Sequence, residues 1–153
     1  MKSISIYNLN QTKALAESFS TLLRQGDIVA LYGTLGVGKT AFTRFLVQKL
    51  CGMQDVPSPT FTLLQTYDAN DFEIFHFDLY RLKKPEEALE LGIEDAFYDG
   101  ASLIEWPEKM GRLLPSKKML KIQIDASGDK RTFTFSSDNP VWQERLEQWS
   151  PKV

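Results

Sequence analysis

A glycine-rich segment between a strand-like run and a helix-like run constrains this chain more than any other feature. Residues 27–32, DIVALY, are apolar enough to form a strand buried on both faces of a sheet. Residues 33–40 read GTLGVGKT and match the pattern G-x-x-x-x-G-K-[ST], while residues 39–50 carry apolar side chains at helical spacing. The sequence therefore opens with a strand, a phosphate-binding loop (P-loop) and a helix.

The residue types in this loop indicate a nucleotide site. Its glycines permit backbone dihedrals that turn successive N–H groups inward, and the helix N-terminus adds its positive end. Lys39 is expected to reach the β and γ phosphates, and the Thr40 hydroxyl is expected to bind Mg²⁺, which prefers oxygen ligands. The predicted phosphate cradle consists of Gly33, Thr34, Leu35, Gly36, Val37, Gly38, Lys39 and Thr40.

Two other strand-like runs end in acids that would complete such a site. In residues 72–80, period-two alternation places His76 and Asp78 on one face of a strand. In residues 101–106, ASLIEW, an apolar run ends at Glu105. A P-loop enzyme needs an acid for the metal and a group that positions water, and spacing alone allows either acid to serve the metal.

Coarse periodicity extends the opening unit into a mixed sheet. The runs 61–67 and 72–80 flank a turn-forming DAND segment, so these two strands are expected to be antiparallel neighbours. The mixture of βα units with hairpins predicts an α/β, three-layer P-loop NTPase-like fold with a mixed parallel and antiparallel central sheet. Further strands are predicted at 3–7, 119–124 and 132–135, and further helices from an N-cap at Asn10 or Thr12 to Gly26, near 85–98 and at 141–149.

Composition narrows the class of protein. The 153 residues and 42% hydrophobic content fit one P-loop domain over residues 1–153. A net charge of -2 disfavours a protein that binds nucleic acid through a largely positive surface. A single cysteine and the absence of a secretory segment favour a reducing cytoplasm, and no run approaches the ~18 apolar residues of a membrane span.

The segment 58–62, SPTFT, lies between the predicted P-loop helix and the next strand. Many P-loop hydrolases keep at this place a mobile loop that senses the γ-phosphate, and Thr60 and Thr62 offer hydroxyls for that purpose. A proline-stiffened entrance to the strand explains the same residues equally well. Arg81 also has two interpretations, because its guanidinium would either bind phosphate or form an ion pair with nearby surface acids.

Four motifs together resemble the bacterial TsaE (YjeE) family, the small P-loop ATPase of tRNA threonylcarbamoyladenosine biosynthesis. They occur in that family's order and spacing, and the resemblance covers nearly the whole chain. The motifs are GTLGVGKT at 33–40, SPTFT at 58–62, HFDLYRL at 76–82 and IEWPE at 104–108.

The resemblance implies ATP hydrolysis with TsaB and TsaD as partners, and it implies that tRNA is reached through their complex. Carried onto this sequence, it assigns Lys39 and the loop amides to the phosphates, and Thr40 and Glu105 to Mg²⁺. It makes Asp78 the acid needed for hydrolysis. It also places Thr60 in a switch-like loop, and Asn10 and Arg131 toward the adenine side of the nucleotide. It puts Trp106 near the site or a partner surface, although an aromatic residue of the core is an equally good interpretation of Trp106.

Other function classes are less consistent with the sequence. A GTPase would need an N-K-x-D element to recognise guanine, and the chain has none. A small P-loop nucleoside or metabolite kinase is the alternative enzyme, although the six arginines are too scattered to indicate an arginine-bearing lid. A nucleotide-gated binding module, in which hydrolysis only resets assembly, is compatible with the family resemblance.

Overall fold

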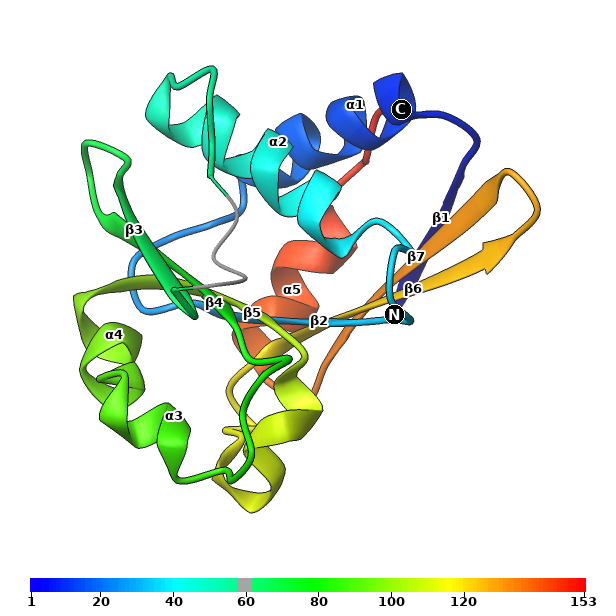
Figure 1. Ribbon diagram of the computed structural model, residues 1–153. Helices are drawn as coiled ribbons and strands as arrows, with labels where there is room; N and C mark the ends of the chain where they lie inside the picture. The colour runs from blue at the N-terminus through cyan, green and yellow to red at the C-terminus, as the bar shows by residue number, and fades with distance from the viewer. Residues whose placement is uncertain (58–61) are drawn as a thin grey trace.

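The computed structural model describes residues 1–57 and 62–153, and its strands form one mixed sheet (Figure 1). The order across the sheet is β1-β7-β6-β2-β5-β4-β3, with β6, β2, β5 and β4 mutually parallel. The strands are β1 (Lys2–Ile6), β2 (Ile28–Tyr32), β3 (Leu64–Asp68), β4 (Glu73–Asp78), β5 (Gly100–Glu105), β6 (Leu120–Ser127) and β7 (Lys130–Ser137).

Helices cover both faces of the sheet, so the predicted three-layer α/β fold is confirmed (Figure 1). One face packs against α1 (Leu9–Ser20), α2 (Lys39–Cys51) and α5 (Pro140–Gln148). The other packs against α3 (Glu87–Glu90), α4 (Ile93–Asp99) and the 3₁₀ helix η1 (Pro107–Leu113). Among the described residues, the helices are too short or too polar to cross a membrane.

The parallel strands explain how residues distant in sequence meet. Leu31 of β2 and Asp78 of β4 both pair with Glu105 of β5, so all three strands end at one edge of the sheet. The P-loop leaves β2 at that same edge. The expected antiparallel pairing of β3 with β4 is also confirmed.

The predicted start of the first helix was wrong. Asn8 is the N-cap of α1, and its side chain accepts a hydrogen bond of 2.9 Å from the N–H of Gln11. The Gln11 side chain in turn accepts from the N–H of Tyr7 at 2.7 Å, a reciprocal arrangement close to a capping box. Asn10 and Thr12 therefore lie inside the helix, which ends at Ser20, well before Gly26.

Gly100 fixes the spacing of β4 and β5 where these strands begin. A Cβ atom at this position would lie 2.1 Å from the carbonyl oxygen of Glu73, the residue opposite it. Ser102 on the same strand differs, because its hydroxyl is buried and has no hydrogen-bond partner among the described residues. Adding a methyl group at position 100 and removing the hydroxyl at position 102 therefore test the packing of one strand in opposite directions.

We predict that Gly100→Ala lowers the free energy of unfolding by about 2 to 3 kcal/mol, because the strands must separate to admit the methyl group. Ser102→Ala is the matched control and should leave stability unchanged or raise it by about 1 kcal/mol, because it removes a buried hydroxyl that has no hydrogen-bond partner among the described residues. Urea unfolding followed by circular dichroism measures both values. Equal stability of the Gly100→Ala variant and the parent would contradict the observed approach of β4 to β5.

Candidate functional site

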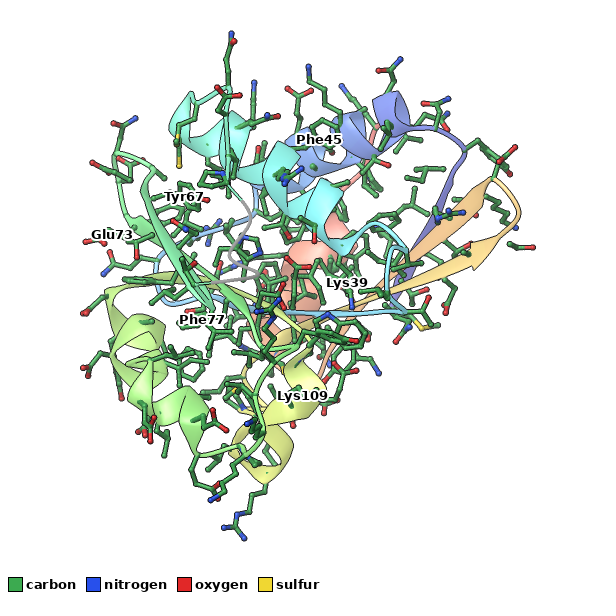
Figure 2. All side chains as sticks on the ribbon, in the orientation of Figure 1. Lys39, Phe45, Tyr67, Glu73, Phe77 and Lys109 are labelled. Carbon is green, nitrogen blue, oxygen red and sulfur yellow. The ribbon has the colours of Figure 1, made fainter. Side chains whose placement is uncertain are left out.

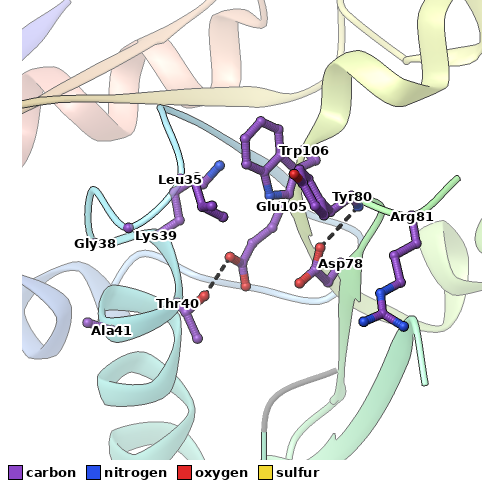
Figure 3. A pocket seen from close by; sticks show the side chains of 11 residues that line it. Leu35, Gly38, Lys39, Thr40, Ala41, Asp78, Tyr80, Arg81, Glu105 and Trp106 are labelled. Atoms are coloured by element: carbon purple, nitrogen blue, oxygen red, sulfur yellow. Dashed lines mark hydrogen bonds between the residues drawn. The ribbon is translucent and has the colours of Figure 1, made fainter. Parts of the chain in front are cut away.

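A cavity of about 390 Å³ lies at the edge where the parallel strands end (Figure 3). It brings together the P-loop, the end of β4 and the end of β5. The predicted site residues Lys39, Thr40, Asp78 and Glu105 all line it. The remaining lining residues are Leu35, Gly36, Gly38, Ala41, Tyr80, Arg81 and Trp106.

The P-loop backbone depends on glycine at position 33. Gly33 has φ +151°, and a Cβ there would lie 2.6 Å from Cγ1 of Val37 and 2.9 Å from the carbonyl oxygen of Ile124. Gly38 precedes α2 and has no side chain to accept from the first amides of the helix. These N–H groups, together with the positive end of the helix, are suited to an anion.

Lys39 is held inside the loop that it would serve. Its side chain is only 4% exposed, and Nζ donates a hydrogen bond of 2.7 Å to the carbonyl of Gly33. Figure 2 shows Lys39 where the P-loop meets α2. The ammonium also lies 3.3 Å from the centroid of the Trp106 ring. Burial lowers the pKa of Lys39, against the opposing attraction of Glu105, Glu108 and Asp78. An anionic ligand in the loop would compensate this buried charge.

Trp106 closes one wall of the cavity from an unusual backbone conformation. It has φ 59° and ψ 49°, in the left-handed region that non-glycine residues rarely adopt. This turn leads from β5 into η1, and it places the indole ring 4.9 Å from the ring of Tyr80. Of the two sequence-based interpretations of Trp106, the structure favours a position at the site.

Glu105 links the start of α2 to β4. Its carboxylate is 2% exposed and accepts two hydrogen bonds. Oε1 accepts from the hydroxyl of Thr40 at 2.8 Å, and Oε2 accepts from Nε2 of His76 at 2.6 Å. Asp78 lies beside it at the end of β4, where Oδ1 accepts from the N–H of Tyr80 at 3.1 Å (Figure 3).

These oxygen atoms fit a magnesium ion. The Thr40 hydroxyl and the carboxylates of Glu105 and Asp78 are hard donors that line a single cavity. The described residues contain no cluster of three or more His, Cys, Asp or Glu side chains able to enclose a metal. Mg²⁺ at nucleotide sites commonly uses one or two protein ligands together with phosphates and waters.

Five described residues of the predicted site do not line the cavity: Gly33, Thr34 and Val37 of the P-loop, Asn10 and Arg131. Arg131 donates from Nε to the carbonyl of Val37 at 3.1 Å, so it braces the P-loop from the start of β7. Asn10 is exposed in the first turn of α1, at the same edge of the sheet. Their assignment to the adenine side stays a prediction. Thr60 lies outside the described residues.

Sequence reasoning missed two contributors to the site, His76 and Tyr80. Period-two alternation predicts His76 on the same face as Asp78, and Tyr80 follows Asp78 by two residues. Their contacts with Glu105 and Trp106 depend on how β4 pairs with β5, which the sequence does not display. A register prediction for the parallel strands would have been the signal that identified them.

Comparison with known proteins supplies the family. A family model described as "Threonylcarbamoyl adenosine biosynthesis protein TsaE" matches residues 6–133. Proteins named "tRNA threonylcarbamoyladenosine biosynthesis protein TsaE" are similar to this chain. The one from Rickettsia conorii is 46% identical over 155 residues, covering 90% of this chain and 88% of the relative. The one from Bacillus subtilis is 33% identical, covering 94% and 90%.

A solved structure supports the same relationship. The crystal structure of Bacillus subtilis YdiB superposes with a TM-score of 0.80 at 29% sequence identity, covering 96% of this chain and 92% of that chain. The mixed sheet and its covering helices are therefore shared with that protein. Because the family model and these relatives span most of its length, this chain belongs to the TsaE family of tRNA threonylcarbamoyladenosine biosynthesis proteins.

Proposed function

We propose that this chain is a P-loop ATPase that converts ATP and water to ADP and phosphate, and that it acts on the TsaB and TsaD pair in a nucleotide-dependent way. The observation that carries the proposal is the meeting of Lys39, Thr40, Asp78 and Glu105 in one cavity at the start of α2. The activity would operate in the cytoplasm, and tRNA would be reached through the partners.

Each residue has a defined task in this proposal. The loop amides and Lys39 would bind the phosphates, and Thr40 and Glu105 would hold Mg²⁺. The bound cation would neutralise charge on the phosphate oxygens. Asp78, which pairs with Glu105 across the two strand ends, would orient the attacking water. When nucleotide binds, the Lys39 ammonium would release the carbonyl oxygen of Gly33 and donate its hydrogen bond to phosphate oxygens instead.

The edge around the cavity has the character of a docking surface. Large apolar side chains are exposed in the segment after β1, at the tip of the P-loop and after β4. They are Tyr7 at 57%, Leu9 at 65%, Leu35 at 73% and Tyr80 at 46% exposed. Leu35 and Tyr80 line the cavity, and exposed apolar side chains at a nucleotide site suit a protein partner that senses whether the site is filled.

The small-kinase alternative receives less support from the same cavity. Small P-loop kinases use arginines on a lid to neutralise the transferred phosphoryl group. Of the six arginines in the chain, only Arg81 lines the cavity, and Arg131 is engaged with the carbonyl groups of Val37 and Gly128. The charge that a kinase would need is therefore not gathered in the described part of the site.

We predict that Lys39→Ala weakens ATP binding by about 100-fold or more, because it removes the cation of the cradle. The circular dichroism spectrum should stay that of the parent, because Lys39 belongs to neither of the apolar clusters that hold the sheet and its helices together. Lys49→Ala, on an exposed lysine of the same helix, is the matched control and should bind ATP normally. Isothermal titration calorimetry gives the affinities, and parental ATP binding and hydrolysis by Lys39→Ala would refute the P-loop assignment.

Replacing Glu105 and replacing Asp78 should have different effects on activity. Glu105→Ala is expected to raise the Mg²⁺ concentration for half-maximal activity by about 10-fold, because it loses a metal ligand. Asp78→Ala should retain nucleotide binding and lower kcat by about 100-fold or more, because orienting water matters in the transition state. Titrating activity against Mg²⁺ for both variants separates these effects. The reverse pattern would exchange the two roles.

Nucleotide and partner should influence each other. We expect an ATP analogue to change the affinity for the TsaB and TsaD pair by at least about 5-fold, and the pair to change ATP turnover, because coupling between sites is reciprocal. Leu9→Glu should weaken binding to the pair by about 10-fold, whereas Leu89→Glu, an exposed leucine on α3, should not.

Calorimetric titrations of the pair, with and without the analogue, measure this coupling. Equal affinities in both conditions, together with unchanged hydrolysis, would reject nucleotide-gated assembly. The kinase reaction would then be the next activity to assay, with nucleosides and small metabolites as acceptors.

A further inference from the structure

His76 is a fully buried polar residue next to the site but outside the cavity wall. It lies on β4, and its Nε2 is 2.6 Å from Oε2 of Glu105, a residue of the neighbouring strand. Its Nδ1 has no hydrogen-bond partner among the described residues. The contact with Glu105 is therefore the polar interaction that the structure shows for this ring.

The direction of this hydrogen bond follows from the chemistry of the two groups. An ionised carboxylate only accepts hydrogen bonds, so Nε2 must carry the proton and donate it. Thr40 donates to the other carboxylate oxygen, Oε1. Glu105 is thus held from two sides, by the helix that follows the P-loop and by β4, and its carboxylate has a fixed orientation.

Stability alone does not account for a histidine at this position. Its strand neighbours Ile74 and Phe77 are apolar and fully buried. A leucine at position 76 would occupy similar space without burying a polar ring that leaves one nitrogen unpaired among the described residues. What histidine adds is a rigid N–H donor that reaches the carboxylate of the next strand.

We infer that His76 is a positioning residue of the metal site, which acts on the cation only through Glu105. This inference rests on the proposed function. Its bond to Oε2 restricts rotation of the carboxylate and leaves Oε1 beside the Thr40 hydroxyl, where the two predicted Mg²⁺ ligands stand together. Partners that orient a metal ligand contribute about 10-fold to 100-fold in metal affinity.

The decisive experiment compares His76→Leu with His76→Gln. Leucine removes the donor, whereas the amide N–H of glutamine reaches about as far as Nε2 of histidine. Binding of Mn²⁺ to the ADP-loaded protein, followed by electron paramagnetic resonance, reports the metal site without turnover. We expect about 10-fold weaker Mn²⁺ binding for leucine and recovery to within about 3-fold for glutamine, with unchanged ADP affinity in the absence of metal.

Two controls separate positioning from a general loss of packing. Phe77→Leu perturbs the core on the opposite face of β4 and should lower stability without changing Mn²⁺ affinity. In a Glu105→Ala background, His76→Leu should cause no further loss, because its effect passes through Glu105. If His76→Leu does not fold, His76→Asn replaces it, since the shorter amide does not reach Glu105.

The outcomes distinguish this inference from the proposed function. Normal Mn²⁺ affinity in His76→Leu, or an equal loss in the glutamine variant, would overturn the positioning role. Additive losses in the double variant would overturn it as well. A parent protein that binds ADP but shows no Mn²⁺ site would instead refute the proposed metal-dependent function.

Discussion

The carboxylate of Glu105 joins the three elements on which the site depends. It belongs to β5, accepts from Thr40 at the start of α2 and accepts from His76 on β4. Hydrogen bonds to a charged group contribute about 1.5 to 3 kcal/mol each, whereas a buried carboxylate without partners would strongly destabilise the fold. Glu105 can therefore stay buried, at 2% exposure, only while the P-loop, α2, β4 and β5 keep their relative positions.

The apolar layers supply the stability that this polar centre lacks. An aromatic cluster around Phe19 links α1 to α5 and to β7, with the Phe19 and Trp142 rings stacked at 6.0 Å. Asp27 and Arg145 form a partly buried ion pair at 2.7 Å that ties α5 to the start of β2, and burial raises the pKa of Asp27. These contacts hold the strands whose ends carry the site.

Local patterns predicted the strand, the P-loop and the following helix because glycine conformation, strand burial and helical periodicity act over a few residues. The N-cap at Asn8 was missed because several polar residues there can cap a helix, and the reciprocal contact with Gln11 decides among them. The bonds from His76 to Glu105 and from Arg131 to Val37 join residues far apart in sequence, so only the assembled sheet reveals them.

A crystal structure with Mg²⁺ and a non-hydrolysable ATP analogue tests the metal-dependent nucleotide site most directly. We expect phosphates on the amides of the P-loop, Nζ of Lys39 on a phosphate oxygen, and the cation about 2.1 Å from the Thr40 hydroxyl oxygen beside Glu105. A nucleotide bound elsewhere, or a cation remote from Thr40 and Glu105, would show that these groups do not form a metal-dependent nucleotide site.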